Sequence, residues 1–435
     1  MRRSFGQTAC VVALLLAGEG VSRPGDLRDA LERAPNAPLS PAQGPGQNVR
    51  DSDRCGEMKT AEAQYLAGVG HWAAKGTPER DEQAVGCFRG AAQRGHPLAQ
   101  YRLAVAYEQG KGVPQARAEA VRWHLRAAEQ GVLESQLQLG EAYESGLGVP
   151  ADRAAAARWY RAAAERGAAE AQYRLGLAYG GGSGVPADRV RAVHWCRRAA
   201  EQGHPEALEW LRTEAEQGGL EAQNDLGTLY FQGLGVPEEP TTAVKWFKAA
   251  ANEGYPPAQY NLGLSHLNRD PAAALPWISK AAAAGYAEAQ NHMGFLLASG
   301  IGAPRDPGAA VGWYRAAALQ GLARAQHNLG YAYDLGLGVP QDRAEAAGWY
   351  RRAAEQGHPK AQHNLAILLA AGDGIPRNRV EALMWLNLSA PQLAGADRDK
   401  VAETRDEIVR QMAVIEVAES GDRERRAAAD RTTRN

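Results

Sequence analysis

One motif recurs along most of this chain with a spacing of 36 residues, and this repeat constrains the fold more than any other feature. Glycine, tryptophan and glutamine keep the spacing in phase, apart from a 15-residue insertion after Gly203 and one repeat that is five residues short. The glutamines are Gln64, Gln100, Gln136, Gln172, Gln223, Gln259, Gln290, Gln326 and Gln362. A fixed period of this length predicts an array of small supersecondary units rather than one globular core.

The stretch 323–357 shows how one repeat is expected to fold. Apolar residues at helical spacing run through its first half, and a second such run carries Trp349 and Tyr350. A Gly-Leu-Gly-Val-Pro turn separates the two runs because proline disfavours helix at the residue before it, and Gly357 ends the second run. Isolated helices shorter than ~12–15 residues are marginal in water, so each pair must stack on its neighbours.

The pattern A-x-A-Q-Y-x-L-G-x-x-Y-x-x-G-x-G-V-P…A-x-x-W-Y-R-x-A-A-E-Q-G resembles the Sel1-like repeat, a relative of the tetratricopeptide repeat. Residues 132–167, 168–203 and 322–357 match it closely, whereas 60–95 match loosely, with Cys87 where Trp is expected. The resemblance implies an all-α, right-handed α-solenoid superhelix of about nine helix-turn-helix repeats with a C-terminal capping helix. Within 60–395 the repeats are 60–95, 96–131, 132–167, 168–203, 219–254, 255–285, 286–321, 322–357 and 358–395, with an insertion helix at 204–218.

The insertion reads HPEALEWLRTEAEQG and interrupts this order. It begins like the first helix of a repeat and ends like the second. A deletion that fused half of each helix into one would account for this. A lone helix breaks the alternation of first and second helices, so we predict a kink or a change of superhelical axis at 204–218. A plain helical extension with smooth stacking is the alternative.

The two ends of the chain differ from the repeats. Residues 1–22 have the layout of a secretory signal peptide, with Arg2 and Arg3 before an apolar stretch that is too short to span a bilayer. Residues 23–59 are rich in Pro and Gly and predict a disordered linker. Residues 396–418 predict a capping helix, and 419–435 a charged, frayed tail.

The leader predicts export, to a bacterial periplasm or out of the cell, with a cytoplasmic location as the alternative. No integral membrane segment is expected in the mature chain. Cys55 precedes the first repeat and Cys87 lies in its second helix, so an oxidising compartment would allow a disulfide between them. Whether the two are bridged stays open at this stage.

The sequence contains no motif that would indicate an enzyme: no G-x-S-x-G, H-E-x-x-H, Walker loop or C-x-x-C. The formal net charge is −1, which argues against a nucleic-acid partner. We therefore predict no catalytic residue, no cofactor and no metal site. His327 and His363 share a repeat position, but zinc needs three or four converging ligands. If the protein were an enzyme, the candidate carboxylates of the groove would be Glu108, Glu141, Glu144 and Asp334. By default we interpret them as solvated side chains on a helix face.

The residue after each repeated glutamine varies while the glutamine does not, and we expect it to face a groove lined by the first helices. These residues are Tyr65, Tyr101, Leu137, Tyr173, Asn224, Tyr260, Asn291, His327 and His363. Tyrosine is enriched at protein interfaces, so the stripe is predicted to bind a protein or peptide partner in the concave groove. The alternative is that these side chains pack between repeats. The tryptophans are expected to be core.

The family resemblance implies a non-catalytic protein–protein interaction scaffold or adaptor in signalling or envelope assembly. A second hypothesis from another class is a glycan-binding protein of the cell envelope, with groove aromatics as platforms for sugars.

Overall fold

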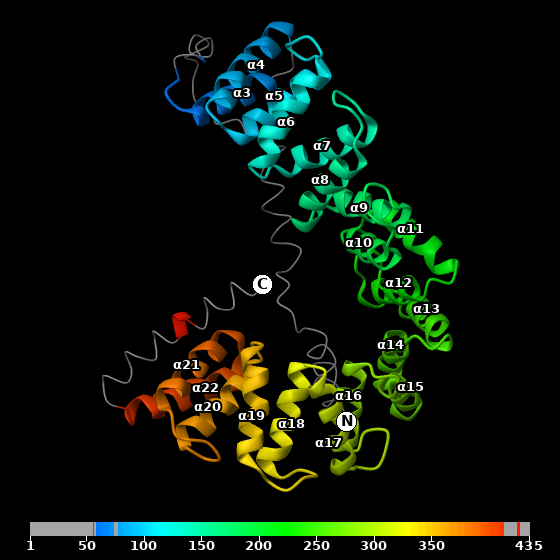
Figure 1. Cartoon of the computed structure of the whole chain (residues 1–435), viewed down its shortest axis with the longest axis vertical. Coiled ribbons are helices and arrows are strands. Elements are labelled where there is room, and N and C mark those ends of the chain that lie inside the picture. The colour runs from blue at the N-terminus through cyan, green and yellow to red at the C-terminus, as the bar shows by residue number, and fades with distance from the viewer. Residues whose placement is uncertain (1–54, 56–57, 74–76, 413–423, 427–435) are drawn as a thin grey trace, which may run out of the picture. The chain divides into compact units, whose positions relative to one another are not determined.

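Each repeat forms two packed α-helices in the computed structural model of the chain (Figure 1). The structure describes residues 55, 58–73, 77–412 and 424–426, and within them every regular element is helical. The predicted leader 1–22, nearly all of the linker 23–59 and most of the tail 419–435 lie outside these residues. Contacts divide the chain into an N-terminal half, Met1–Trp210, and a C-terminal half, Leu211–Asn435.

In the N-terminal half, successive helices pack in four pairs, α3 with α4, α5 with α6, α7 with α8 and α9 with α10. Their bounds are α3 Ala61–Ala73, α4 Pro78–Gln93, α5 Pro97–Gln109, α6 Arg117–Glu129, α7 Leu133–Ser145, α8 Arg153–Glu165, α9 Ala169–Gly181 and α10 Arg189–Glu201. The lone helix α11, Pro205–Glu216, carries the boundary between the halves.

In the C-terminal half, five further pairs run from α12 to α21 and are followed by a last helix. Their bounds are α12 Leu220–Gln232, α13 Pro240–Asn252, α14 Pro256–Leu267, α15 Pro271–Ala283, α16 Ala287–Ser299, α17 Pro307–Leu319, α18 Ala323–Leu335, α19 Arg343–Glu355, α20 Pro359–Ala371, α21 Arg379–Ser389, the 3₁₀ turn η2 Ala390–Gln392 and α22 Gly395–Arg410. The all-α solenoid of paired helices is confirmed.

The ends of the helices explain the spacing of glycine and aspartate. The repeat-ending glycines, from Gly95 to Gly357, have φ between 84° and 95°, in the left-handed region that glycine adopts without strain. In the turn, Gly338 has φ +77°, and a Cβ there would clash with the backbone of Pro307 in the preceding repeat. Most second helices begin with a side-chain cap, as where Asp342 accepts a hydrogen bond from the Glu345 backbone N–H at 2.9 Å.

In most repeats the core forms where a side chain of the second helix packs on a glycine of the first, and Ala104 and Ala366 stand at this position in the other two. Tyr350 is fully buried against Gly330, and Tyr160 lies in the same way against Gly140. These tyrosines directly follow a tryptophan, which is the less buried of the two. The expectation that the tryptophans form the core therefore holds for Trp349 and Trp385, at 8% and 5% exposed, while Trp123, Trp159, Trp195, Trp246, Trp277 and Trp313 are half-buried.

The repeated glutamine is a buried clasp between successive repeats. Gln326 donates from Nε2 to the Ala318 carbonyl of the preceding second helix at 3.2 Å, and its Oε1 accepts from Gln356 at 2.8 Å. Leaving a buried polar atom unpaired costs about 1–3 kcal/mol, so the second bond strengthens the connection where it forms. In several repeats, among them that of Gln136, the buried Oε1 has no such partner among the described residues. The constant glutamine thus has a structural cause.

The insertion helix α11 combines features of both helix types. At its start, His204 accepts the Ala207 backbone N–H at 3.3 Å, as His96 and His358 do at the start of first helices. At its end, the Ala215 carbonyl accepts from Gln223 at 2.9 Å, as a second helix does for the glutamine clasp. These features agree with a fusion of two half-helices, and the kink predicted at 204–218 stays a prediction.

The C-terminal helix α22 covers the last pair. Val401 and Ile408, at 0% and 4% exposed, join one core cluster with residues of α20 and α21. The helix begins one residue before the expected 396 and ends at Arg410, and residues 413–418 lie outside the described residues.

Candidate functional site

The residues predicted to line the groove are placed between neighbouring repeats. Tyr65, Asn224 and Asn291 are each 8% exposed, and the other members of the series are half-buried. Several of the rings in this series pack on a histidine that caps a following helix. The ring centroids are 4.5 Å apart for Tyr65 and His96, and 4.9 Å apart for Tyr173 and His204. The geometry agrees with the alternative that this stripe joins repeats, while its half-buried members retain a surface for a partner.

In the C-terminal half, side-chain amides make the same connection. Asn261 donates to Asn224 at 2.8 Å, and Asn328 donates to Asn291 at 2.9 Å. Each donor lies two residues after its repeated glutamine, and each acceptor lies one residue after the glutamine of an earlier repeat. One N–H of each amide is used in this way, which leaves a second donor on the same nitrogen.

A more exposed position on the first helices was missed by the sequence analysis. Tyr331 and Ile367 lie five residues after their glutamines and are 45% and 43% exposed, and Phe295 occupies the same position one repeat earlier. The full series is Val69, Val105, Glu141, Leu177, Thr228, Leu264, Phe295, Tyr331 and Ile367. Comparing the repeats at this position would have shown a mostly apolar column that the glutamine series does not reveal.

The histidines on this face have polar side-chain neighbours and no converging metal ligands among the described residues. His327 Nε2 lies 3.4 Å from Asn364 Nδ2, and His363 Nε2 lies 3.4 Å from Thr404 Oγ1. Burial and the charge of Lys360 lower the pKa of His327 to about 4, so it is neutral at pH 7. Burial lowers the pKa of His292 to about 4 as well.

One side-chain group has the composition of a hydrolytic triad. His124 Nδ1 lies 3.1 Å from Ser135 Oγ, and its Nε2 lies 3.2 Å from Glu108 Oε1. Ser135 is 0% exposed and His124 is 1% exposed, so no substrate reaches the hydroxyl. The arrangement ties α5, α6 and α7 together.

The remaining groove carboxylates are also engaged in structural contacts. Tyr160 donates to Glu144 Oε2 at 2.7 Å, and Tyr350 donates to Asp334 Oδ2 at 3.3 Å, in equivalent places of two repeats. Burial raises the pKa of the Glu141 carboxyl. None of these contacts brings two carboxylates together around an open space.

Cys55 and Cys87 are joined by a disulfide, with their Cα atoms 5.1 Å apart. His71 completes a group whose ligand atoms lie within 4.8 Å of one another. A metal would require thiolates, which a disulfide does not offer. Cys196 is buried against Gly176 and forms no disulfide among the described residues, at a place where several other repeats have a tyrosine or phenylalanine.

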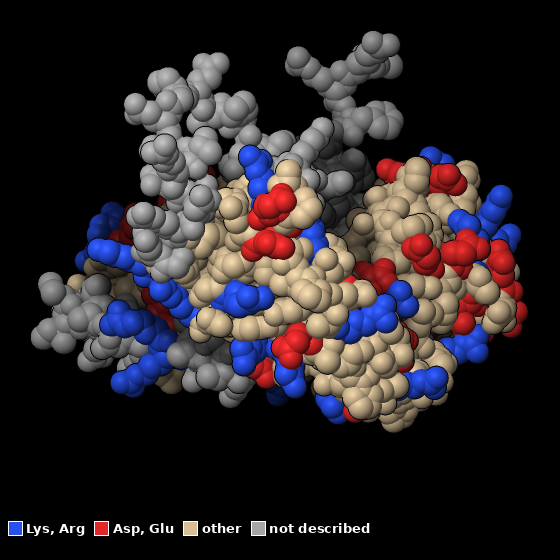
Figure 2. All heavy atoms as spheres, turned by 90° about the horizontal axis from the view of Figure 1, so that it is seen from above, with Lys and Arg blue, Asp and Glu red and all other residues tan. Residues whose placement is uncertain are grey.

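Charge is mixed on the one face of the molecule that is drawn as spheres in Figure 2. Figure 2 shows Lys and Arg interspersed with Asp and Glu on the face in view, without the basic stripe that a nucleic-acid footprint would require. Within the described ranges, no helix is both long enough and apolar enough to cross a bilayer.

Nine segments of the chain match the family model described as Sel1 repeat. Their bounds lie within one residue of the predicted ones, except that the last match ends at residue 390 rather than 395. They are residues 61–96, 97–132, 133–167, 169–204, 220–255, 256–286, 287–322, 323–358 and 359–390. No curated protein sequence matches the chain.

Solved structures include other proteins of this type. The chain is 29% identical to a protective antigen of uropathogenic Escherichia coli with an SLR fold, over 88% of this chain and 94% of that one, with a TM-score of 0.36. It is 28% identical to a Sel1 repeat protein from Oxalobacter formigenes, over 85% and 98% of the two chains, with a TM-score of 0.43. These superpositions are too loose to carry an argument, so the assignment rests on the matched repeats. The segments cover more than half of the sequence, and the chain belongs to the Sel1 repeat family, whose members are generally non-catalytic protein-interaction scaffolds.

Proposed function

We propose that this chain is a non-catalytic scaffold that binds a protein or peptide partner on its first helices, in signalling or envelope assembly. The observation that supports it best is the column of Phe295, Tyr331 and Ile367 on α16, α18 and α20. Tyr331 and Ile367 expose nearly half of their surface at equivalent positions, where buried packing does not require them. Large apolar side chains on consecutive first helices provide anchor points for a partner.

The half-buried residues after the glutamines are proposed to form the edge of this surface. Tyr101 and Tyr173 expose part of their rings beside arginines, and aromatic rings make large contacts with little loss of side-chain freedom. In this proposal they contribute to binding as well as to the connection between repeats.

The test is a crosslinking capture from an extract of the native host. We expect the wild type to capture a defined partner, and Y331A/I367A to reduce its recovery at least tenfold while L319A, which alters an exposed leucine on the second helix α17, does not. Equal recovery with both variants would refute the role of this column. Unchanged binding in a folded Y101A/Y173A variant would remove the tyrosines from the surface, and specific binding to soluble glycans without a protein partner would favour the glycan-binding alternative.

Export is proposed together with this function. The disulfide between Cys55 and Cys87 supports an oxidising compartment, since cytosolic proteins rarely keep such bonds. N-terminal sequencing of the native protein is expected to find a start after residue 22 or close to it, and thiol counting to find one free cysteine, Cys196. An intact N-terminus with three or more free thiols would place the protein in the cytoplasm.

A further inference from the structure

Two neighbouring pockets of the C-terminal half share one wall. Asn328 and Tyr331 of α18 line both of them. The first pocket has a volume of about 240 Å³ and lies toward α16 and α17, and the second, of about 390 Å³, lies toward α20 and α22. A ligand that occupies both would cross Tyr331, the most exposed aromatic of the column.

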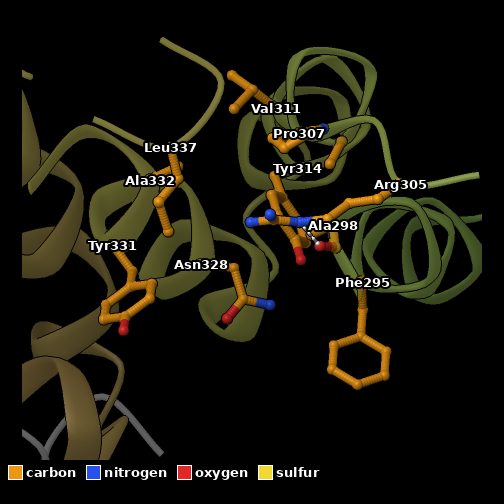
Figure 3. Close-up of a pocket in the computed structure, with 11 residues that line it drawn as sticks. Phe295, Ala298, Arg305, Pro307, Val311, Tyr314, Asn328, Tyr331, Ala332 and Leu337 are labelled. Carbon is orange, nitrogen blue, oxygen red and sulfur yellow. Dashed lines mark hydrogen bonds between the residues drawn. The ribbon is translucent and has the colours of Figure 1, made fainter. Parts of the chain in front are cut away.

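The first pocket is mostly apolar. Figure 3 shows Tyr331 on one side of it and Phe295 on the other, with Tyr314 and Arg305 between them. Arg305 is held in place because its Nε donates to the Ala298 carbonyl at 3.0 Å. The volume suits one large apolar side chain rather than a drug-sized molecule.

The second pocket is polar and carries positive charge. Lys360 and Lys400 line it together with the amides of Asn328 and Asn364. Across the two pockets, the lining includes three cations, Arg305 being the third, and a single carboxylate, Asp397. This balance favours an anionic ligand group over a cationic one.

Asp397 shows where such a group would be held. Its Oδ2 lies 3.1 Å from Lys360 Nζ, in an ion pair that is about half exposed. The carboxylate belongs to the first turn of α22, whose N-terminus has no side-chain cap and therefore keeps unsatisfied N–H groups that attract negative charge. A second carboxylate can be bound beside Asp397 by Lys400, or can replace Asp397 at Lys360.

We propose that this double pocket binds a short acidic segment of a protein partner. An apolar side chain of the segment enters the first pocket, and an aspartate or glutamate side chain nearby enters the second. The inference rests on the proposed function and specifies the chemistry of the partner. A free phosphate would also be attracted by the lysines, but it would leave the adjoining apolar pocket unused.

The test measures fluorescence anisotropy of labelled peptides with the full chain. The probe is fluorescein-Gly-Ser-Phe-Gly-Asp-Asp-Gly-Ser-amide, and the matched peptides carry Asn for both Asp residues or Ala for Phe. We expect each change to weaken binding about tenfold, and added salt to weaken only the acidic peptides. The C-terminal amide removes the terminal carboxylate of the peptide, so an effect of carboxylates on binding must come from the Asp side chains.

Protein variants separate this site from general electrostatics. K360A/K400A is expected to weaken binding of the acidic probe about tenfold, whereas K245A/K248A removes the same charge from exposed positions on α13 and should leave binding unchanged. D397N should strengthen binding, because it frees Lys360. The proposal is overturned if the Asn peptide binds equally well, if both lysine pairs have the same effect, or if inorganic phosphate at equal concentration displaces the probe fully.

The outcome also distinguishes the two proposals. If a partner is captured from the host extract by wild type and by K360A/K400A alike, the scaffold function stands and the acidic-segment inference fails. If peptide binding follows the predicted pattern but no partner is captured under any condition, the proposed function fails instead.

Discussion

The two halves of the molecule use the same repeat but connect and decorate it differently. In the N-terminal half, the residue after the glutamine is most often a tyrosine that packs on a histidine, as Tyr173 packs on His204. In the C-terminal half, asparagines form hydrogen bonds from one first helix to the next, and the exposed column becomes Phe295, Tyr331 and Ile367. The buried positions are therefore set by the stack, while the first-helix face is free to differ along the chain.

The largest expected effect tests whether the repeats of the two halves have the same kind of core. Tyr160 and Tyr350 are both buried against a glycine, and both donate to a carboxylate. Y160A and Y350A should each lower the free energy of unfolding of their own half by about 3–5 kcal/mol, because each leaves a cavity. Hydrogen exchange read separately in α8 and α19 would measure it. If only one of the two substitutions lowered the free energy of unfolding of its half, the cores of the two halves would not be equivalent.

The turn glycines should respond equally in both halves. Gly184 and Gly338 have φ of +72° and +77°, and a Cβ on either would strike the backbone of the preceding repeat. G184A and G338A should each cost about 2–4 kcal/mol from backbone strain and overpacking. The control G348A lies in α19 with open space around it and should stabilise by about 0.5–1 kcal/mol. Denaturant titration compares them, and a neutral G338A would contradict the close approach.

Acid should affect the C-terminal half through His292, which is 2% exposed. Burial lowers the pKa of His292 to about 4, below the usual value of 6.5, so the unfolded chain takes up the proton first. The stability from this residue is complete above about pH 6.5 and is lost as the pH falls toward 4. The loss is on the order of 1–3 kcal/mol. H292Q should reduce the difference in stability between pH 7 and pH 4.5, and an unchanged difference would show that His292 is not its source.

The smallest effect concerns the glutamine clasp. Gln326 has partners on both polar atoms, whereas the buried Oε1 of Gln136 has no hydrogen-bond partner among the described residues, since Arg166 stands where Gln356 closes the other clasp. Q326L should cost about 1 kcal/mol, and Q136L should be close to neutral because it also removes an unpaired atom. Equal costs from thermal or denaturant unfolding would mean that the second bond contributes nothing.

The repeat itself could be predicted because its cause is local. Glycines at positive φ, prolines at turns and apolar residues at helical spacing act within a few residues, so the period of 36 and the helix pairs followed directly from the sequence. Even the mixed character of 204–218 was visible in the sequence, since HPEA at its start is typical of a first helix and AEQG at its end of a second. The His204 cap and the Ala215 acceptor agree with it.

The candidate site was predicted less well for a physical reason. The position after the glutamine varies, and variation suggested exposure. Tyr65 and Tyr173 nevertheless contact histidines about 30 positions further along, His96 in the next repeat and His204 in the insertion. Only the packing of successive pairs shows that Tyr331 is exposed while Tyr65 is buried, at 45% and 8%.

The sequence by itself determined the all-α repeat, its number of units and the small residues at each turn, because those depend on backbone conformation and on contacts that recur every 36 residues. The tertiary structure decided which repeated positions are covered by the next repeat and which stay open. Tyr331, Lys360 and Lys400 come from three different helices and Arg305 from the turn before α17, and only stacking brings them to the lining of two adjoining pockets.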